Sequence, residues 1–130
     1  NVVANSDLIE TVRDADLIIF CAPHQFMHAI CKQIQMTVKP TAFAISLIKG
    51  IHISPEGPQL ISTMVRRMLN IECSVLMGAN LADEIGPNGL AEATIGAHFI
   101  EQGRIFRELF HTPYFNVDVI NDVEGAELAG

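Results

Sequence analysis

Three short apolar runs, separated by amphipathic stretches, constrain the fold of this chain more than any other feature. The runs cover residues 17–22, 42–48 and 75–77, and a single polar residue, Ser46, interrupts them. A strand that is apolar at every position is expected in the middle of a parallel sheet, where helices cover both faces. The pattern therefore predicts an α/β fold built from strand–helix crossovers.

Apolar side chains also recur at helical or strand spacing between and after these runs. The expected helices cover residues 7–15, 26–34, 58–69 and 105–110. Further strands are expected over residues 1–4 and 115–119. Ser6 is a good N-cap for the first helix, and Pro58 suits the first turn of the third. A last helix is expected to begin shortly before Gly130.

Composition narrows the class of protein. The chain has 130 residues, 49% of them hydrophobic, which suffices for one domain with one core. Eight basic and fifteen acidic residues give a net charge of −7, which disfavours nucleic-acid binding. No apolar run is long enough to span a membrane, and no signal peptide is recognisable.

The cysteines favour a reducing compartment. Cys21, Cys31 and Cys73 are an odd set without a C-x-x-C pair, so neither a zinc site nor a disulfide framework is supported. Buried thiols of a cytosolic protein are the plain interpretation. No metal site and no Ser-His-Asp arrangement can be defended from the remaining residues.

Three short segments follow the apolar runs and are candidates for a binding site. They are residues 23–26, 49–50 and 78–82. Because ligands of open α/β sheets bind beyond the carboxyl ends of the strands, these segments are expected to line one cleft. Lys49 is the most suggestive residue, since its ammonium can meet a carbonyl or phosphate oxygen. The alternative is a solvated lysine in a loop.

Other residues of these segments each have two interpretations. The ring of Phe26 can lie against a flat cofactor or pack in the core, because Phe26 heads an apolar helical stripe. His24 can act as a general acid or simply cap a helix. Gly78 permits close approach of a ligand or ends a strand, and Asn80 can bind a substrate or cap the next segment.

At the same segments the chain resembles a known family. The motifs are Pro-His-Gln-Phe (23–26), Ile-Ser-Leu-Ile-Lys-Gly (45–50), Ser-Val-Leu-Met-Gly-Ala-Asn (74–80), Thr-Ile-Gly (94–96) and Leu-Phe-His-Thr-Pro (109–113). Together they resemble the eukaryotic-type NAD-dependent glycerol-3-phosphate dehydrogenases, in the same order and with similar spacing over nearly all of the chain. The resemblance implies a Rossmann-like, doubly wound parallel sheet.

The resemblance also implies an activity and a set of site residues. The family interconverts sn-glycerol 3-phosphate and dihydroxyacetone phosphate by hydride transfer with NAD. By similarity, Lys49 and Asn80 bind substrate, while Phe26 and the backbone of Ala82 contact the cofactor. No catalytic role is implied for His24. A full-length homodimer in the cytoplasm, active in carbohydrate metabolism and binding neither nucleic acid nor membrane, is expected.

Parts of the family pattern are expected to lie outside these residues. No G-x-G-x-x-G occurs, so the glycine-rich first unit is missing. The proton-transferring lysine of an Ala-Leu-Lys-Asn motif is expected beyond Gly130, so no catalytic residue is assigned within the chain. Residues 1–120 are expected to be part of the NAD-binding domain, and residues 121–130 to begin the helix that links it to a helical C-terminal domain.

Two further interpretations remain open beside this one. The protein is either a related dehydrogenase of the same architecture that acts on another hydroxy acid or phosphate, or a non-catalytic nucleotide-binding module that kept the fold. Because the phosphate cradle is missing, these 130 residues alone are expected to be inactive and to bind NAD poorly.

Overall fold

A computed structural model describes residues 2–55, 57–79 and 89–130. Its elements in chain order are α1 (Leu8–Arg13), β1 (Leu17–Phe20), the 3₁₀ turn η1 (His24–Phe26), α2 (Met27–Ile34), β2 (Phe43–Ser46), β3 (Ile51–Ser54), β4 (Gly57–Leu60), α3 (Ile61–Leu69), β5 (Cys73–Met77), β6 (Ala91–Gly96), α5 (Ile100–Phe110), β7 (Phe115–Ile120) and α6 (Val123–Ala129). Among the helices described, none combines the length and apolar character needed to cross a membrane.

A five-stranded sheet with the order β1-β2-β5-β6-β7 forms the centre of the fold. The first three strands are parallel, so their carboxyl ends meet at one edge of the sheet. Strand β6 runs antiparallel to β5, and β7 is parallel to β6. The predicted α/β fold with a mainly parallel sheet is confirmed, and the β5–β6 pairing is its antiparallel exception.

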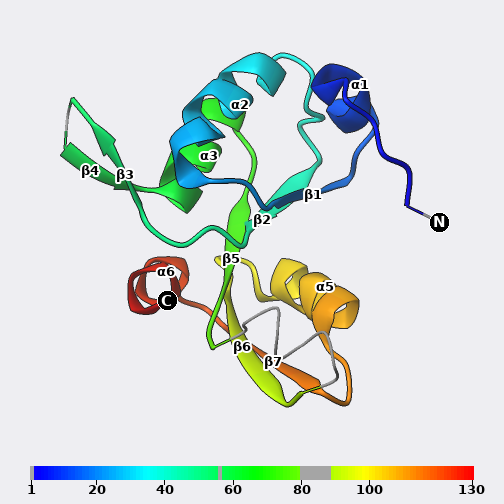
Figure 1. The fold of residues 1–130 in the computed structure, drawn as a ribbon, viewed down its shortest axis with the longest axis vertical. Coiled ribbons are helices and arrows are strands. Elements are labelled where there is room, and N and C mark those ends of the chain that lie inside the picture. The colour runs from blue at the N-terminus through cyan, green and yellow to red at the C-terminus, as the bar shows by residue number, and fades with distance from the viewer. Residues whose placement is uncertain (1, 56, 80–88) are drawn as a thin grey trace.

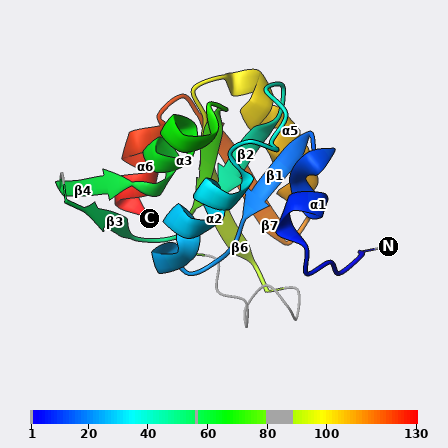
Figure 2. The same ribbon diagram turned by 90° about the horizontal axis from the view of Figure 1, so that it is seen from above.

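Helices cover both faces of the sheet (Figures 1 and 2). On one face, Cys73 packs in a core formed with α1, α2 and α3, while Val75 and Met77 pack against α6. On the other face, Leu76 joins a core centred on the fully buried Phe106 of α5. Alternate residues of β5 thus face opposite sides of the sheet, and apolar residues cover both sides, which explains why this strand is apolar on both faces.

The chain before β1 differs from the sequence-based expectation. Residues 2–4 form no strand, and Val2 and Val3 are exposed. Asp7, not Ser6, caps the first helix, because its carboxylate accepts the Glu10 N–H at 3.0 Å. β-Branched residues favour a strand when a neighbouring strand pairs with them, and none of the described strands does so here.

Pro58 is the second correction. The helix expected over residues 58–69 begins only at Ile61, and Pro58 lies in β4, opposite Ile53 of β3. These two strands form a separate hairpin that projects from the body of the fold (Figure 1). The stacked rings of His28 and His52, with centroids 6.0 Å apart, connect the hairpin to α2. Proline fits an exposed two-stranded ribbon because it has no backbone N–H and no further strand requires a donor at this position.

Strand β6 was not predicted. Its buried residues alternate with Glu92 and Thr94, and this mixture gives no apolar run. Its partner β7 was expected and is found, with Val117 fully buried. The helix expected before Gly130 is also present as α6, which Asp122 caps by accepting the Gly125 N–H.

Candidate functional site

The site lies at the edge where β1, β2 and β5 end. Lys49 follows β2 by three residues, and its Nζ donates a hydrogen bond to the Gly78 carbonyl oxygen at 3.0 Å. Gly78 directly follows β5, so the lysine side chain crosses from the end of one strand to the end of its neighbour. Two of the three predicted segments therefore meet, as expected for parallel strands.

Gly78 is required by the packing of the adjacent strand. Its φ is +150°, and a Cβ at this position would lie 2.6 Å from the Glu92 carbonyl oxygen and 2.9 Å from the Ala93 Cα. The close approach left open by the sequence is therefore made by the backbone of β6. Because β6 holds this strand end, the carbonyl that accepts from Lys49 has a fixed position.

The third segment forms the other side of the site. A shallow pocket of about 330 Å³ lies between the ends of β1 and β2, and its lining includes Cys21, His24 and Lys49. The His24 ring lies beside Gly50, where a Cβ would be 3.8 Å from Nδ1. Gly50 has a φ of +111°, so the chain turns sharply directly after the lysine.

Phe26 does not belong to the core. Its side chain is 52% exposed, whereas Met27, Cys31 and Ile34, the residues of the same stripe, are fully buried. The core interpretation of Phe26 is therefore wrong, and its ring is accessible at the end of η1. Asn80 and Ala82 lie outside the described residues.

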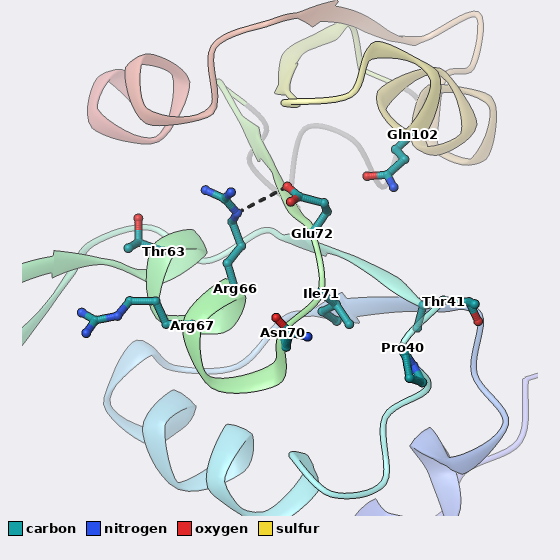
Figure 3. A pocket seen from close by; sticks show the side chains of 10 residues that line it. Pro40, Thr41, Thr63, Arg66, Arg67, Asn70, Ile71, Glu72 and Gln102 are labelled. Carbon is teal, nitrogen blue, oxygen red and sulfur yellow. Dashed lines mark ion pairs between the residues drawn. The ribbon is translucent and has the colours of Figure 1, made fainter.

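A second pocket, of about 460 Å³, lies at the opposite edge of the sheet (Figure 3). Glu72, just before β5, lies 3.3 Å from Arg66 Nε and 3.4 Å from His98 Nδ1. The other ring nitrogen of His98 is 3.3 Å from Glu124 on α6. These charges lie far apart in the sequence, and no pattern in it predicts their meeting.

Burial suppresses the reactivity of two cysteines. Burial raises the pKa of the Cys31 thiol to about 11. It also raises the pKa of the Cys73 thiol, with a further contribution from the negative charge of Glu127. Both are buried free thiols, as expected from the sequence, but Cys21 is exposed.

Comparison with known proteins gives the family. Residues 1–102 match the model of the family described as NAD-dependent glycerol-3-phosphate dehydrogenase N-terminus. The chain is 48% identical over 130 residues to the human glycerol-3-phosphate dehydrogenase 1-like protein. It is 49% identical over 139 residues to the Candida albicans glycerol-3-phosphate dehydrogenase [NAD(+)] 2. All of the chain is covered in both cases, but only 37% and 38% of the relatives.

Solved structures agree with this assignment. The structure of DsGPDH of Dunaliella salina matches 97% of the chain with a TM-score of 0.93 and 54% identity, over 22% of its own length. Glycerol-3-phosphate dehydrogenase from Saccharomyces cerevisiae matches 95% of the chain with a TM-score of 0.86 and 39% identity, over 37% of its own length. The chain thus spans little more than a third of its curated relatives, and it belongs to the family of NAD-dependent glycerol-3-phosphate dehydrogenases.

Proposed function

We propose that the whole protein is an NAD-dependent oxidoreductase that interconverts sn-glycerol 3-phosphate and dihydroxyacetone phosphate by hydride transfer. The observation that carries the proposal is the Lys49 ammonium, held against the Gly78 carbonyl at the shared carboxyl edge of the sheet. Within the described residues no carboxylate lies within ion-pair distance of Lys49. Its charge is therefore available to an anionic ligand, in a chain of net charge −7.

Lys49 is suited to bind the oxygens of such a substrate. An ammonium has three N–H donors, and the Gly78 carbonyl takes one of them. The remaining donors can face a phosphate oxygen or the oxygen that carries negative charge as the carbonyl is reduced. A cation fixed before the substrate arrives stabilises this charge without further reorganisation.

The residues at this edge also fit a dinucleotide. Gly50 and Gly78 carry no side chains, and the exposed ring of Phe26 offers a flat apolar surface. We assign Phe26 and the backbone of Ala82 to cofactor binding, and Lys49 and Asn80 to substrate binding. When bound, NAD accepts or supplies the hydride, while the residues of this chain bind and orient the reactants.

The remaining parts of the proposal rest on the family. We propose that residues 1–120 are part of the NAD-binding domain and that residues 121–130 begin the helix to a further, helical domain. The proton-transferring lysine then follows α6. The whole protein is proposed to be a cytoplasmic homodimer of carbohydrate metabolism that binds neither nucleic acid nor membrane.

The proposal is tested in the full-length protein with dihydroxyacetone phosphate and NADH. Lys49→Ala is expected to lower kcat/KM by roughly 100- to 1,000-fold, the typical loss when one oriented donor is removed from a developing negative charge. Lys39→Ala is the matched control. That lysine is bound to the Asp14 carbonyl and the Asp16 carboxylate, before β2 and away from the site.

The control variant is expected to keep wild-type kinetics. Wild-type kinetics in Lys49→Ala would remove Lys49 from the site. Absence of any reduction of dihydroxyacetone phosphate by the wild-type protein, with activity toward another hydroxy acid or phosphate, would replace the proposed substrate.

A further inference from the structure

Helix α3 is capped by a residue from another helix. Its own N-cap position, Leu60, provides no side-chain hydrogen bond. Instead, the Glu127 carboxyl group on α6 accepts the Ser62 backbone N–H at 3.1 Å and the Ser62 hydroxyl as well. Ser62 is the second residue of α3, where backbone N–H groups have no partner within the helix. Glu127 thus acts as the N-cap of α3, although it lies 65 residues away from Ser62 in the sequence.

This contact is buried. Glu127 is 6% exposed and Ser62 is 1% exposed. A carboxyl group is seldom placed in a protein interior unless hydrogen bonds satisfy it and a favourable dipole faces it. The N-terminus of α3 offers both. The pair therefore links α6 to the first turn of α3 at one point.

Helix α6 in turn packs against the strand end that holds Lys49. Val123 and Ala126 contact Val75 and Met77 of β5. At the end of α6, a Cβ on Gly130 would lie 2.6 Å from the Met77 sulfur. Met77 directly precedes Gly78, whose carbonyl accepts from the Lys49 ammonium. A continuous set of contacts therefore leads from Glu127, through α6 and the end of β5, to the ammonium.

We propose that Glu127 is a positioning residue for the Lys49 site. By binding Ser62 it helps to hold α6 in place, and α6, together with β6, holds the end of β5 whose Gly78 carbonyl accepts from the ammonium. This inference rests on the proposed role of Lys49 in substrate binding. Glu127 itself is buried and is not among the residues assigned to substrate or cofactor binding.

The test uses the full-length protein and four variants, Glu127→Ala, Glu127→Gln, Ser62→Ala and Glu124→Gln. Glu127→Ala removes both hydrogen bonds. It is expected to raise KM for dihydroxyacetone phosphate and to lower kcat, with a combined loss on the order of 10- to 100-fold, as a small misplacement of a binding group produces. Assays run well below the Tm of each variant, so that the folded fraction is the same.

Glu127→Gln is the rescue variant. Its amide oxygen can accept the Ser62 N–H and its amide nitrogen can donate to the Ser62 hydroxyl, so it is expected to stay within a few-fold of wild type. Ser62→Ala removes the hydroxyl contact alone and is expected to give an intermediate loss. Glu124→Gln is the matched control on the exposed side of the same helix, where Glu124 contacts His98, and is expected to leave kinetics unchanged.

A double variant shows whether the effect passes through Lys49. If it does, Lys49→Ala combined with Glu127→Ala loses little more activity than Lys49→Ala alone, because coupled residues are not additive. Additive losses would overturn the inference, and so would a Glu127→Ala protein with a lowered Tm but wild-type kcat and KM. If Glu127→Ala does not fold, wild-type kinetics in Ser62→Ala would have the same meaning.

The two proposals fail in different ways. Full activity of Lys49→Ala would end the proposed function of Lys49, whatever Glu127 does. Loss of activity in Lys49→Ala together with wild-type kinetics in Glu127→Ala would end only the positioning role.

Discussion

The cationic side chains at the two edges of the sheet have different partners. At the carboxyl edge, the Lys49 ammonium contacts a neutral carbonyl, and none of the described carboxylates neutralises it. At the opposite edge, Arg66 is paired with Glu72 (Figure 3). Glu72 also contacts His98. A cation that is already paired with a carboxylate has less to offer a ligand. Arg66, in the larger of the two pockets, is therefore less available to an anionic ligand than Lys49 is.

Gly78→Ala, at the carboxyl edge, is expected to lower the stability of the protein more than any other proposed variant. The added Cβ would meet the β6 backbone at 2.6 Å, so the strand end must move, with an expected cost of about 3 kcal/mol or more in unfolding free energy. Gly57→Ala is the matched control, since Gly57 also has a positive φ of +120° but has no atom within 4 Å of its Cβ. Its expected cost is about 1 kcal/mol, from backbone strain.

Urea unfolding of the two full-length variants measures this difference. Gly78→Ala is also expected to lose activity, because the carbonyl that holds Lys49 is displaced. Equal stability and equal activity of the two variants would show that the close contact with β6 does not fix the site.

Alkaline pH is expected to lower the free energy of unfolding, through a buried thiol in the core between the two edges. Burial raises the pKa of the Cys31 thiol to about 11 in the folded protein, from the ordinary value of 9.0. A group whose pKa is higher in the folded protein than in the unfolded chain contributes to stability at pH values below its pKa in the unfolded chain. This contribution is lost as the pH rises through its pKa in the folded protein. The free energy of unfolding should therefore fall between pH 9 and about pH 11.

Urea unfolding at several pH values tests this expectation. Cys31→Ala is expected to reduce the slope of stability against pH. An equal slope in the wild type and in Cys31→Ala would contradict the buried-thiol explanation.

Disruption of the opposite edge is expected to have the smallest effect. Arg66 and Glu72 are about one-third exposed, so Arg66→Ala should lower stability by about 0.5–1 kcal/mol. Because this edge is not the proposed site, kcat/KM should stay at the wild-type value. A loss of kcat/KM comparable to that of Lys49→Ala would show that the substrate binds at the Arg66 edge, and would contradict the proposed site.

The sequence predicts the parts of the fold that local patterns encode. Strands β1, β2 and β5 were expected because they are apolar on both faces, and from their order it followed that Lys49 and Gly78 share an edge. Strand β6 was missed because Glu92 and Thr94 interrupt its apolar pattern. Its position beside β5 depends on tertiary pairing, not on its own periodicity.

The site was predictable to a similar degree. Lys49 stood out because a cation follows an apolar strand, but the exposure of Phe26 could not be deduced, since periodicity alone also fits a core residue. The Ser62–Glu127 contact joins residues 65 positions apart, and neither residue belongs to a local capping pattern. Only the packing of α6 on β5 and β6 brings Glu127 to the first turn of α3.

A structure of the full-length protein with NAD and dihydroxyacetone phosphate bound would show which edge the substrate uses. We expect a substrate oxygen within about 3 Å of the Lys49 Nζ, at the carboxyl edge beside Gly78. A substrate phosphate bound instead by Arg66 and Arg67, at the amino ends of β2 and β5, would contradict the proposed site.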